Sequence, residues 1–409
     1  MLNDINEARV SLYDKVVMIV LLLYSILNIY GVEAMTIAEG LTIILLGVGL
    51  LTNKLSFKLT KYIRFYLIYM CLVIVVSADF NFNWISRLIG VAYTYLTFSL
   101  FYSRINLTYF LKVYRILSLF FICFFFIQEV SFATIGTRPV GIIPFLPVVS
   151  DLGTDDFSSH LSIASRSSSF FSEPAHFAQF LLPLLAYEVF MRKGCDRNLI
   201  VLMISVTILM LLSGNGIIGF GVLLCYYIWN YTKSVKKTYR YLAIIVIAGL
   251  VSIGITYYMS SESGQVLLNR TNELTLADPE VGSESGFVRI YRGYFVYDNL
   301  NLFEKIVGLG NFERLRERIV TSSVGWTFDD NDNYFNVIQN VLIRTGILGM
   351  IIMLLFLFKD LWHKNNACAK SLVLVFFTFS FMSNLYLTPT MILYTIIPYC
   401  LKFKKEKFI

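Results

Sequence analysis

The chain has 409 residues, of which 57% are hydrophobic and 15% charged, and its net charge is +7. Soluble domains usually carry about 25% charged residues, and surface-to-volume scaling limits how much apolar surface one core can bury. The positive charge does not indicate nucleic-acid binding, because the basic residues lie in short loops between apolar runs. The composition therefore excludes an ordinary soluble protein and predicts an integral membrane protein that contacts membrane lipid and no nucleic acid.

The apolar runs predict the number of membrane spans. A spanning helix needs about 20 mainly apolar residues, and the charged N-terminal stretch does not look like a cleavable signal, so the first span is expected to remain. We predict an all-α fold, a polytopic transmembrane helical bundle in which residues 1–409 form a single integral membrane domain. Its spans number about twelve and lie near residues 16–32, 34–51, 63–78, 84–102, 111–131, 172–191, 198–213, 215–231, 241–259, 334–358, 371–387 and 388–402.

The distribution of basic residues predicts the orientation of the bundle. Lysine and arginine recur in alternate loops, and the positive-inside rule places these loops, with both termini, in the cytoplasm. The opposite side carries two long segments, a shorter one at 132–171 between spans five and six and a longer one at 260–333 between spans nine and ten. Long loops in compact proteins are usually functional. We therefore expect the working residues at the extracytoplasmic ends of the spans.

The segment from Arg166 to His176 is the most informative in the chain, and it reads Arg-Ser-Ser-Ser-Phe-Phe-Ser-Glu-Pro-Ala-His. Pro174 suits the first turn of a helix, and an outward-facing helix N-terminus favours anions. Glu173, His176 and Gln179 form one polar stripe on that helix. Ionisable residues within a membrane usually face a cavity or a partner, so we predict a functional role. The alternative is a structural Glu173–Arg166 pair that caps the helix.

A second polar stripe marks the start of the span near 334–358. Asn333, Asn336, Asn340 and Arg344 follow a helical spacing, and Asp332 lies at the outer end of the same stripe. Arg344 is on the order of 16 Å along the helix from Asn333. An arginine that deep needs a carboxylate, a water-filled cavity or an anionic ligand. The alternative is hydrogen bonding between helices.

The long loop is rich in arginine. Arg289 and Arg292 lie one helical turn apart and precede the Gly308-Leu-Gly310 sequence. The planar guanidinium fork suits a diphosphate better than a lysine point charge does. The later run of alternating charges at 313–318 is instead typical of a solvated amphipathic helix with intrahelical pairs.

Other motifs predict neither a cofactor nor a metal. Gly214, Gly216 and Gly219 spell G-x-G-x-x-G, but they join two apolar helices rather than a strand and a helix, which indicates close helix packing. The six cysteines avoid the two long polar segments, so we expect no disulfide framework. The three histidines show no metal-ligand spacing, and we expect metal-independent chemistry.

Taken together, these features resemble the O-antigen polymerase (Wzy) family of bacterial oligosaccharide repeat-unit polymerases and, more distantly, the O-antigen ligases. Ligases typically carry His-Asn where this chain has Asp-Asn, which weakens a ligase assignment. The features that match are the spans and the motifs Arg166…Ser-Phe-Phe-Ser-Glu173-Pro174, Arg289/Arg292 before Gly308-Leu-Gly310, and Asp332-Asn333-Tyr-Phe…Gly346-Ile-Leu-Gly349.

The resemblance implies a membrane glycosyltransferase of the bacterial cytoplasmic (inner) membrane. It would polymerise undecaprenyl-diphosphate-linked oligosaccharide repeat units into O-antigen or capsule-type polysaccharide on the outer side, with a chain-length regulator and a flippase as partners. Two rival functions are an O-antigen ligase and a flippase or transporter of lipid-linked oligosaccharide. Many transporters show internal repeats and broken midplane helices, whereas this chain shows no evident repeat and its polar residues gather on one side.

The resemblance and the polar stripes together give a set of expected site residues. The arginines would neutralise the diphosphate as the glycosidic bond breaks, while Glu173, His176 or Asp332 would orient or deprotonate the acceptor hydroxyl. The expected catalytic residues are Arg166, Glu173, His176, Arg289 and Asp332. The expected substrate-binding residues are Arg138, Arg292, Asn333, Asn336 and Arg344.

Overall fold

The computed structural model describes residues 10–32, 35–57, 59–77, 83–149, 167–232, 289–310, 312–325, 328 and 334–404. Regular structure within these ranges is almost entirely helical, so the expected all-α fold is confirmed. The strands found there, β1 (Gly31–Val32) and β2 (Met35–Thr36), form one short antiparallel pair between two helices.

The described helices occupy the predicted apolar runs. A helix lies at every expected span within the described residues, and the expected span near 241–259 lies outside them. The first group comprises α2 (Leu12–Leu27), α3 (Ile37–Leu51), α4 (Lys61–Val76), α5 (Asn83–Arg104), α6 (Leu107–Ile135), α8 (Pro174–Phe190), α9 (Arg197–Met210) and α10 (Gly214–Tyr231). Three short helices lie instead within the long segment predicted at 260–333, namely α14 (Arg292–Asp298), α15 (Leu302–Val307) and α16 (Phe312–Thr321). They are followed by α17 (Val337–Leu355), η5 (Phe356–Leu361), α18 (Ala367–Phe379), α19 (Pro389–Tyr399) and η6 (Cys400–Lys404).

Several helix boundaries differ from those predicted, among them the ends of α6 and α18. Helix α6 continues four residues beyond the expected end and stops at Gly136, whose φ of 78° gives a left-handed cap that favours glycine. Helix α18 ends at Phe379, whereas the expected span continued to residue 387. Residues 380–387 of that span form a non-helical loop instead. This loop, residues 380–388, leads to Pro389, which opens α19 as prolines commonly do at a first helical turn.

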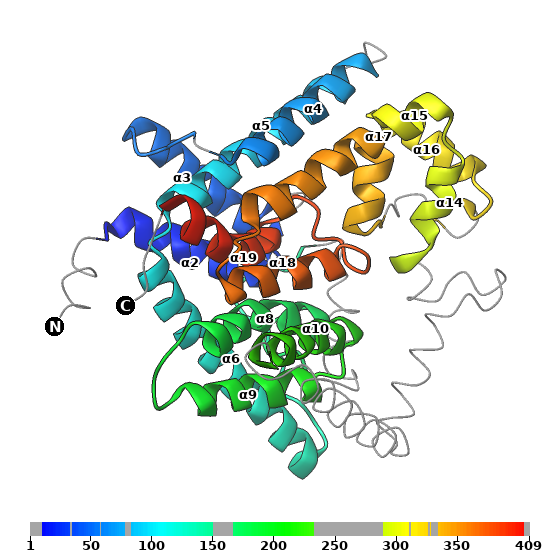
Figure 1. The fold of residues 1–409 in the computed structure, drawn as a ribbon. Coiled ribbons are helices and arrows are strands. Elements are labelled where there is room, and N and C mark those ends of the chain that lie inside the picture. Colours follow the sequence, from blue (N-terminus) through cyan, green and yellow to red (C-terminus); the bar gives the residue numbers. More distant parts are fainter. Residues whose placement is uncertain are drawn as a thin grey trace.

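Helix α19 lies near the centre of the fold and packs against α2, α5, α8 and α18 (Figure 1). Buried tyrosines join these helices through their hydroxyl groups, as buried tyrosines usually do. Tyr394 donates to the Gln179 carbonyl oxygen of α8 at 2.6 Å. Tyr102 of α5 and Thr395 of α19 share a hydrogen bond of 2.6 Å. The core therefore depends on specific polar contacts as well as apolar packing.

The glycines of α10 let this helix approach its neighbours closely. A Cβ atom placed on Gly216 would lie 2.7 Å from the Cβ of Ala178, and one on Gly219 would lie 2.6 Å from Cδ1 of Leu182. Both neighbours belong to α8. The Gly-x-Gly-x-x-Gly sequence thus serves close helix packing, as the sequence predicted.

At the end of α8 opposite its Pro174 start, a charge network joins α6, α8 and the following turn. The Glu188 carboxylate is fully buried and lies 3.5 Å from Arg115 and 3.2 Å from Arg192. Asp196 pairs with the same two arginines. The hydrogen bond from Arg115 holds the pKa of the Asp196 carboxyl below its usual range. Each charge in the network is therefore compensated.

We expect Glu188→Ala to lower the free energy of unfolding by about 2 kcal/mol, less than the ~3–5 kcal/mol typical of a wholly buried pair, because both arginines remain partly exposed. The measurement is the melting temperature of the purified chain in detergent. Lys193→Ala is the matched control, because Lys193 is an exposed charge outside this network. Equal melting temperatures for the two variants would show that the Glu188 charge network does not stabilise the fold.

Two described helices are long and apolar enough to cross a membrane, namely α6 and the continuous run of α17 and η5 from Val337 to Leu361. Helices α3, α9 and α18 are apolar but shorter. Many large apolar side chains of α6 face outward, including Ile116, Phe120, Ile127 and Val130, each more than half exposed.

Candidate functional site

Helix α17 is broken beside the predicted polar stripe. Gly346 adopts φ 64° and ψ −169°, a conformation essentially restricted to glycine, and the helix changes direction there. The carbonyl oxygens of Ile343 and Arg344 are taken up by another segment. They accept hydrogen bonds from the Leu309 amide at 2.9 Å and the Gly310 amide at 3.3 Å. The loop between α15 and α16 thus fills the break in α17.

The glycines of this contact are required by close backbone approach. A Cβ atom on Gly308 would overlap the Arg344 carbonyl oxygen, and one on Gly346 would overlap the Ile306 carbonyl oxygen. Gly308 and Gly310 also have positive φ angles of 99° and 62°. The Gly308-Leu-Gly310 and Gly346 motifs therefore belong to one structural feature, in which two chain segments meet backbone to backbone.

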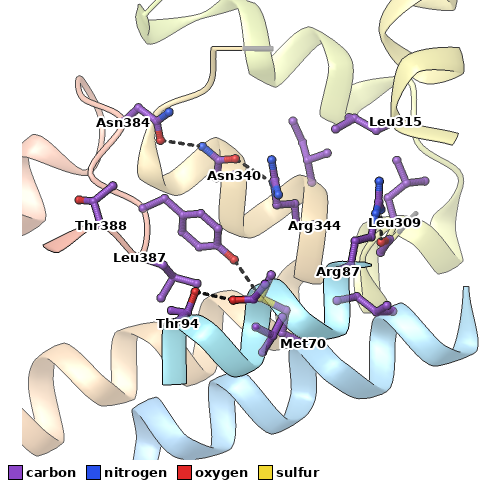
Figure 2. Close-up of a pocket in the computed structure, with 16 residues that line it drawn as sticks. Met70, Arg87, Thr94, Leu309, Leu315, Asn340, Arg344, Asn384, Leu387 and Thr388 are labelled. Atoms are coloured by element: carbon purple, nitrogen blue, oxygen red, sulfur yellow. Dashed lines mark hydrogen bonds between the residues drawn. The ribbon is translucent and has the colours of Figure 1, made fainter. Parts of the chain in front are cut away.

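Beside the break lies a cavity of about 530 Å³, which we call the Arg344 cavity (Figure 2). Arg344 of α17 and Arg87 of α5 approach it from two sides. The Arg344 Nε donates to Asn340 Oδ1 at 3.0 Å, and its guanidinium carbon lies 6.0 Å from the Tyr386 ring centre. Arg87 donates to the Gly310 carbonyl oxygen at 2.8 Å. No carboxylate of the described residues lies within ion-pair distance of Arg344.

A second cavity of about 510 Å³, the His176 cavity, adjoins the first. Its wall includes His176 and Gln179 of the predicted α8 stripe together with Glu39 of α3. The two cavities share four lining residues, Thr94, Asn384, Leu387 and Thr388. The two cavities therefore adjoin across these residues, between the broken helix α17 and the start of α8, and together they are called the joined cavities.

The 380–388 loop joins the two predicted polar stripes. Ser383 Oγ accepts hydrogen bonds of 2.9 Å from the side-chain amides of Gln179 and Asn215. Asn384 Oδ1 accepts from Asn340 Nδ2 at 3.2 Å. Asn384 was not among the expected site residues, because the sequence placed it at the end of the expected 371–387 span, where a short loop near 384–388 carries no basic residue. The Asn384…Thr388-Pro389 sequence, a loop residue followed by a helix-start signal, was the available indication.

Two of the expected catalytic residues lie together at the mouth of α8. Arg289 Nη2 is 3.7 Å from Glu173 Oε2, and both side chains are substantially exposed. Asn336 caps α17 and also donates to the Arg289 carbonyl oxygen at 2.9 Å, which ties the arginine to the second stripe. Pro174 occupies the first turn of α8 as predicted, with Glu173 as the capping residue. His176 Nδ1 shares a hydrogen bond of 2.8 Å with Ser172 Oγ.

The structure places the other expected residues elsewhere. Arg292 is 1% exposed, with its guanidinium carbon 3.9 Å from the Phe328 ring centre. Arg138 donates to Ser167 Oγ at 3.0 Å, pairs with Glu129 and lines neither cavity. Arg292 and Arg138 therefore lie outside the two cavities. Arg289 and Glu173 also line neither cavity, but Glu173 lies between Ser172 and His176, which form part of the wall of the His176 cavity. The remaining expected residues, which lie outside the described ranges, are Arg166, Asp332 and Asn333.

The predicted amphipathic helix at 313–318 is present as α16. Arg318 of this helix pairs with Glu304 of α15 at 3.1 Å. Within the described ranges, no group of three or more His, Cys, Asp or Glu side chains is placed to hold a metal ion.

No model of a known protein family matches the chain, and no curated protein sequence is significantly similar to it. The site combines a cationic half around Arg344 with a half that contains an imidazole and a carboxylate. The first suits an anionic group, and the second suits proton transfer to or from a hydroxyl.

Proposed function

We propose that the chain is a membrane glycosyltransferase that polymerises undecaprenyl-diphosphate-linked oligosaccharides into O-antigen or capsule-type polysaccharide. The observation that carries the proposal is the pair of joined cavities. One is lined by Arg344, an arginine with no carboxylate partner among the described residues, and the other by His176 and neutral polar groups. A chain-length regulator and a flippase would be its partners, because both act on the same lipid-linked material.

The exposed apolar faces support a membrane location. A helix such as α6, with large apolar side chains turned outward, is stable only when lipid or another protein covers that face. We propose about twelve spans, both termini in the cytoplasm and the joined cavities toward the outer face of the bacterial cytoplasmic membrane. Broken helices at membrane depth are tolerated where protein or a cavity adjoins them, and the break in α17 has both.

The Arg344 cavity has the lining expected for a polyprenyl diphosphate. Met70, Ile74 and Val91, from α4 and α5, provide an apolar wall that suits an isoprenoid chain. Arg344 and Arg87 provide guanidinium groups for the diphosphate. The Asn384–Thr388 turn and the His176 cavity then supply amide and hydroxyl groups suited to sugars. This division fits a lipid-linked donor and a glycan acceptor side by side.

In the proposed reaction, the acceptor hydroxyl oxygen bonds to the anomeric carbon of the donor glycan. The bond from that carbon to the phosphate oxygen breaks, and the diphosphate leaves with the electron pair. Arg344 and Arg289 stabilise the leaving charge, which is the form of catalysis that preorganised cations provide. His176 or Glu173 accepts the hydroxyl proton. Simultaneous binding of both substrates supplies much of the rate through positioning.

Reconstitution tests the class of reaction. The purified chain in lipid vesicles, supplied with undecaprenyl-diphosphate repeat units and neither nucleotide nor metal, is expected to yield a ladder of glycan lengths. A ligase would yield no ladder, and would transfer preformed polymer to an added lipid A core. A flippase would move substrate across the bilayer without changing its length. Either outcome would replace the polymerase assignment.

We expect Arg289→Ala to shorten the surface polysaccharide to one or a few repeats at normal protein levels. The variant removes the cation beside Glu173, and loss of one transition-state contact typically costs about 10²-fold in rate. Gel analysis of glycan from a strain carrying the variant measures this. Arg316→Ala in α16 is the matched control, because Arg316 is an exposed arginine outside the pair of Arg289 and Glu173. Normal long chains from Arg289→Ala would contradict its role.

A further inference from the structure

An apolar slot lies on the molecule away from the joined cavities. It has a volume of about 250 Å³ and is formed by α8, α9 and α10, which pack side by side (Figure 1). Its walls are almost wholly apolar, and Arg197 and Asn198 stand at the first turn of α9. Because the slot shares no lining residue with either cavity, the proposed reaction does not account for it.

The lining residues are ordered by polarity along the slot. Helices α8 and α10 run antiparallel to α9, so Phe190 and Tyr227 lie at the same end as Arg197, while Leu185 and Phe220 lie at the other. The nine residues from Arg197 to Ser205 span about 12 Å of helix. One end of the slot is therefore cationic and aromatic, and the remainder is apolar. The slot is too long to be filled by a small anion alone.

Arg197 is distinct from the other arginines at this end of the bundle. Arg115 and Arg192 are both paired with Glu188 and Asp196. The guanidinium of Arg197 contacts the neutral Asn198 Oδ1, at 3.2 and 3.3 Å, and no carboxylate of the described residues. A guanidinium with this environment retains its capacity to bind an anion.

We propose that this slot binds one anionic phospholipid of the inner leaflet, with an acyl chain between α8, α9 and α10 and the phosphate at Arg197. The slot reaches the exterior of the bundle, where Tyr227, one of its lining residues, is 41% exposed. Basic sites between helices on the cytoplasmic side are suited to anionic headgroups, which are concentrated there. The proposal rests on the membrane orientation and not on the glycosyltransferase reaction.

Binding measurements on the purified chain test this site separately from activity. Native mass spectrometry would compare phosphatidylglycerol with phosphatidylcholine of the same acyl chains. We expect the anionic lipid to bind about tenfold more tightly, because both lipids carry the phosphate but the choline ammonium group of phosphatidylcholine repels the Arg197 guanidinium. Arg197→Gln should abolish that preference. Ser205→Leu, which fills the slot and leaves the arginine in place, should weaken both lipids.

Lys193→Gln is the matched control, because Lys193 is an exposed cation near Arg197 that does not line the slot, and it should bind as the wild type does. Equal losses in Arg197→Gln and Lys193→Gln would overturn the proposal in favour of diffuse attraction. So would unchanged binding in Ser205→Leu, or competition by free glycerol phosphate as effective as by the lipid, since either result would show that no acyl chain occupies the slot.

Discussion

Gly346→Ala is expected to destabilise the protein far more than the same substitution at a helical glycine whose Cβ position faces open space. The new Cβ would overlap the backbone carbonyl of Ile306, which no side-chain rotation relieves. The positive φ adds backbone strain of about 1–3 kcal/mol, and overpacking adds a similar amount. We expect a total loss of about 4 kcal/mol, seen as a lower melting temperature in detergent and a smaller yield of monodisperse protein.

Gly221→Ala in α10 is the control for this substitution. A Cβ atom at Gly221 would meet no atom within 4 Å, and the residue lies in an uninterrupted helix. Alanine there should be neutral or stabilising by about 0.5–1 kcal/mol. If Gly346→Ala melted at the same temperature as Gly221→Ala, the backbone contact between Gly346 and the loop at Gly308 would not exist in the folded protein.

The helices could be predicted from the sequence because their determinants are local. Apolar runs of sufficient length, prolines at first turns and capping residues all act over a few residues. Asn336 and Gln339, for example, form a reciprocal capping box that starts α17 where the polar stripe begins. The polar stripe of Asn336, Asn340 and Arg344 was visible for the same reason, since helical spacing alone places these side chains on one face.

The site could be predicted only in part, because its contacts join distant segments. The sequence placed Arg289 and Glu173 on the same side of the membrane, but their ion pair depends on how the loop docks on α17. The break at Gly346 was equally hidden, because the amides that donate to the freed carbonyl oxygens of α17 belong to Leu309 and Gly310. Arg292 has the same local sequence setting as Arg289, yet it packs against Phe328. Periodicity cannot distinguish two such arginines.

Arg344→Ala is expected to reduce the turnover number about 10²-fold, the usual cost of removing one preorganised group that stabilises developing negative charge. Stability should change little, within about 1 kcal/mol, because the side chain borders a cavity that water can fill. Product ladders from the reconstituted chain, together with melting temperatures, measure both effects. A variant with reduced turnover and an unchanged melting temperature would separate catalysis from folding.

Arg344→Lys distinguishes the planar guanidinium from charge alone. Lysine retains the positive charge but loses the geometry that binds two phosphate oxygens at once and the Nε donor to Asn340. We therefore expect turnover between those of the wild type and Arg344→Ala. Because the leaving diphosphate gains charge only as the glycosidic bond breaks, the lysine variant should lose more in kcat than in KM. Full activity in Arg344→Ala would place the diphosphate elsewhere, and the pair of Arg289 and Glu173 would then mark the leaving-group site.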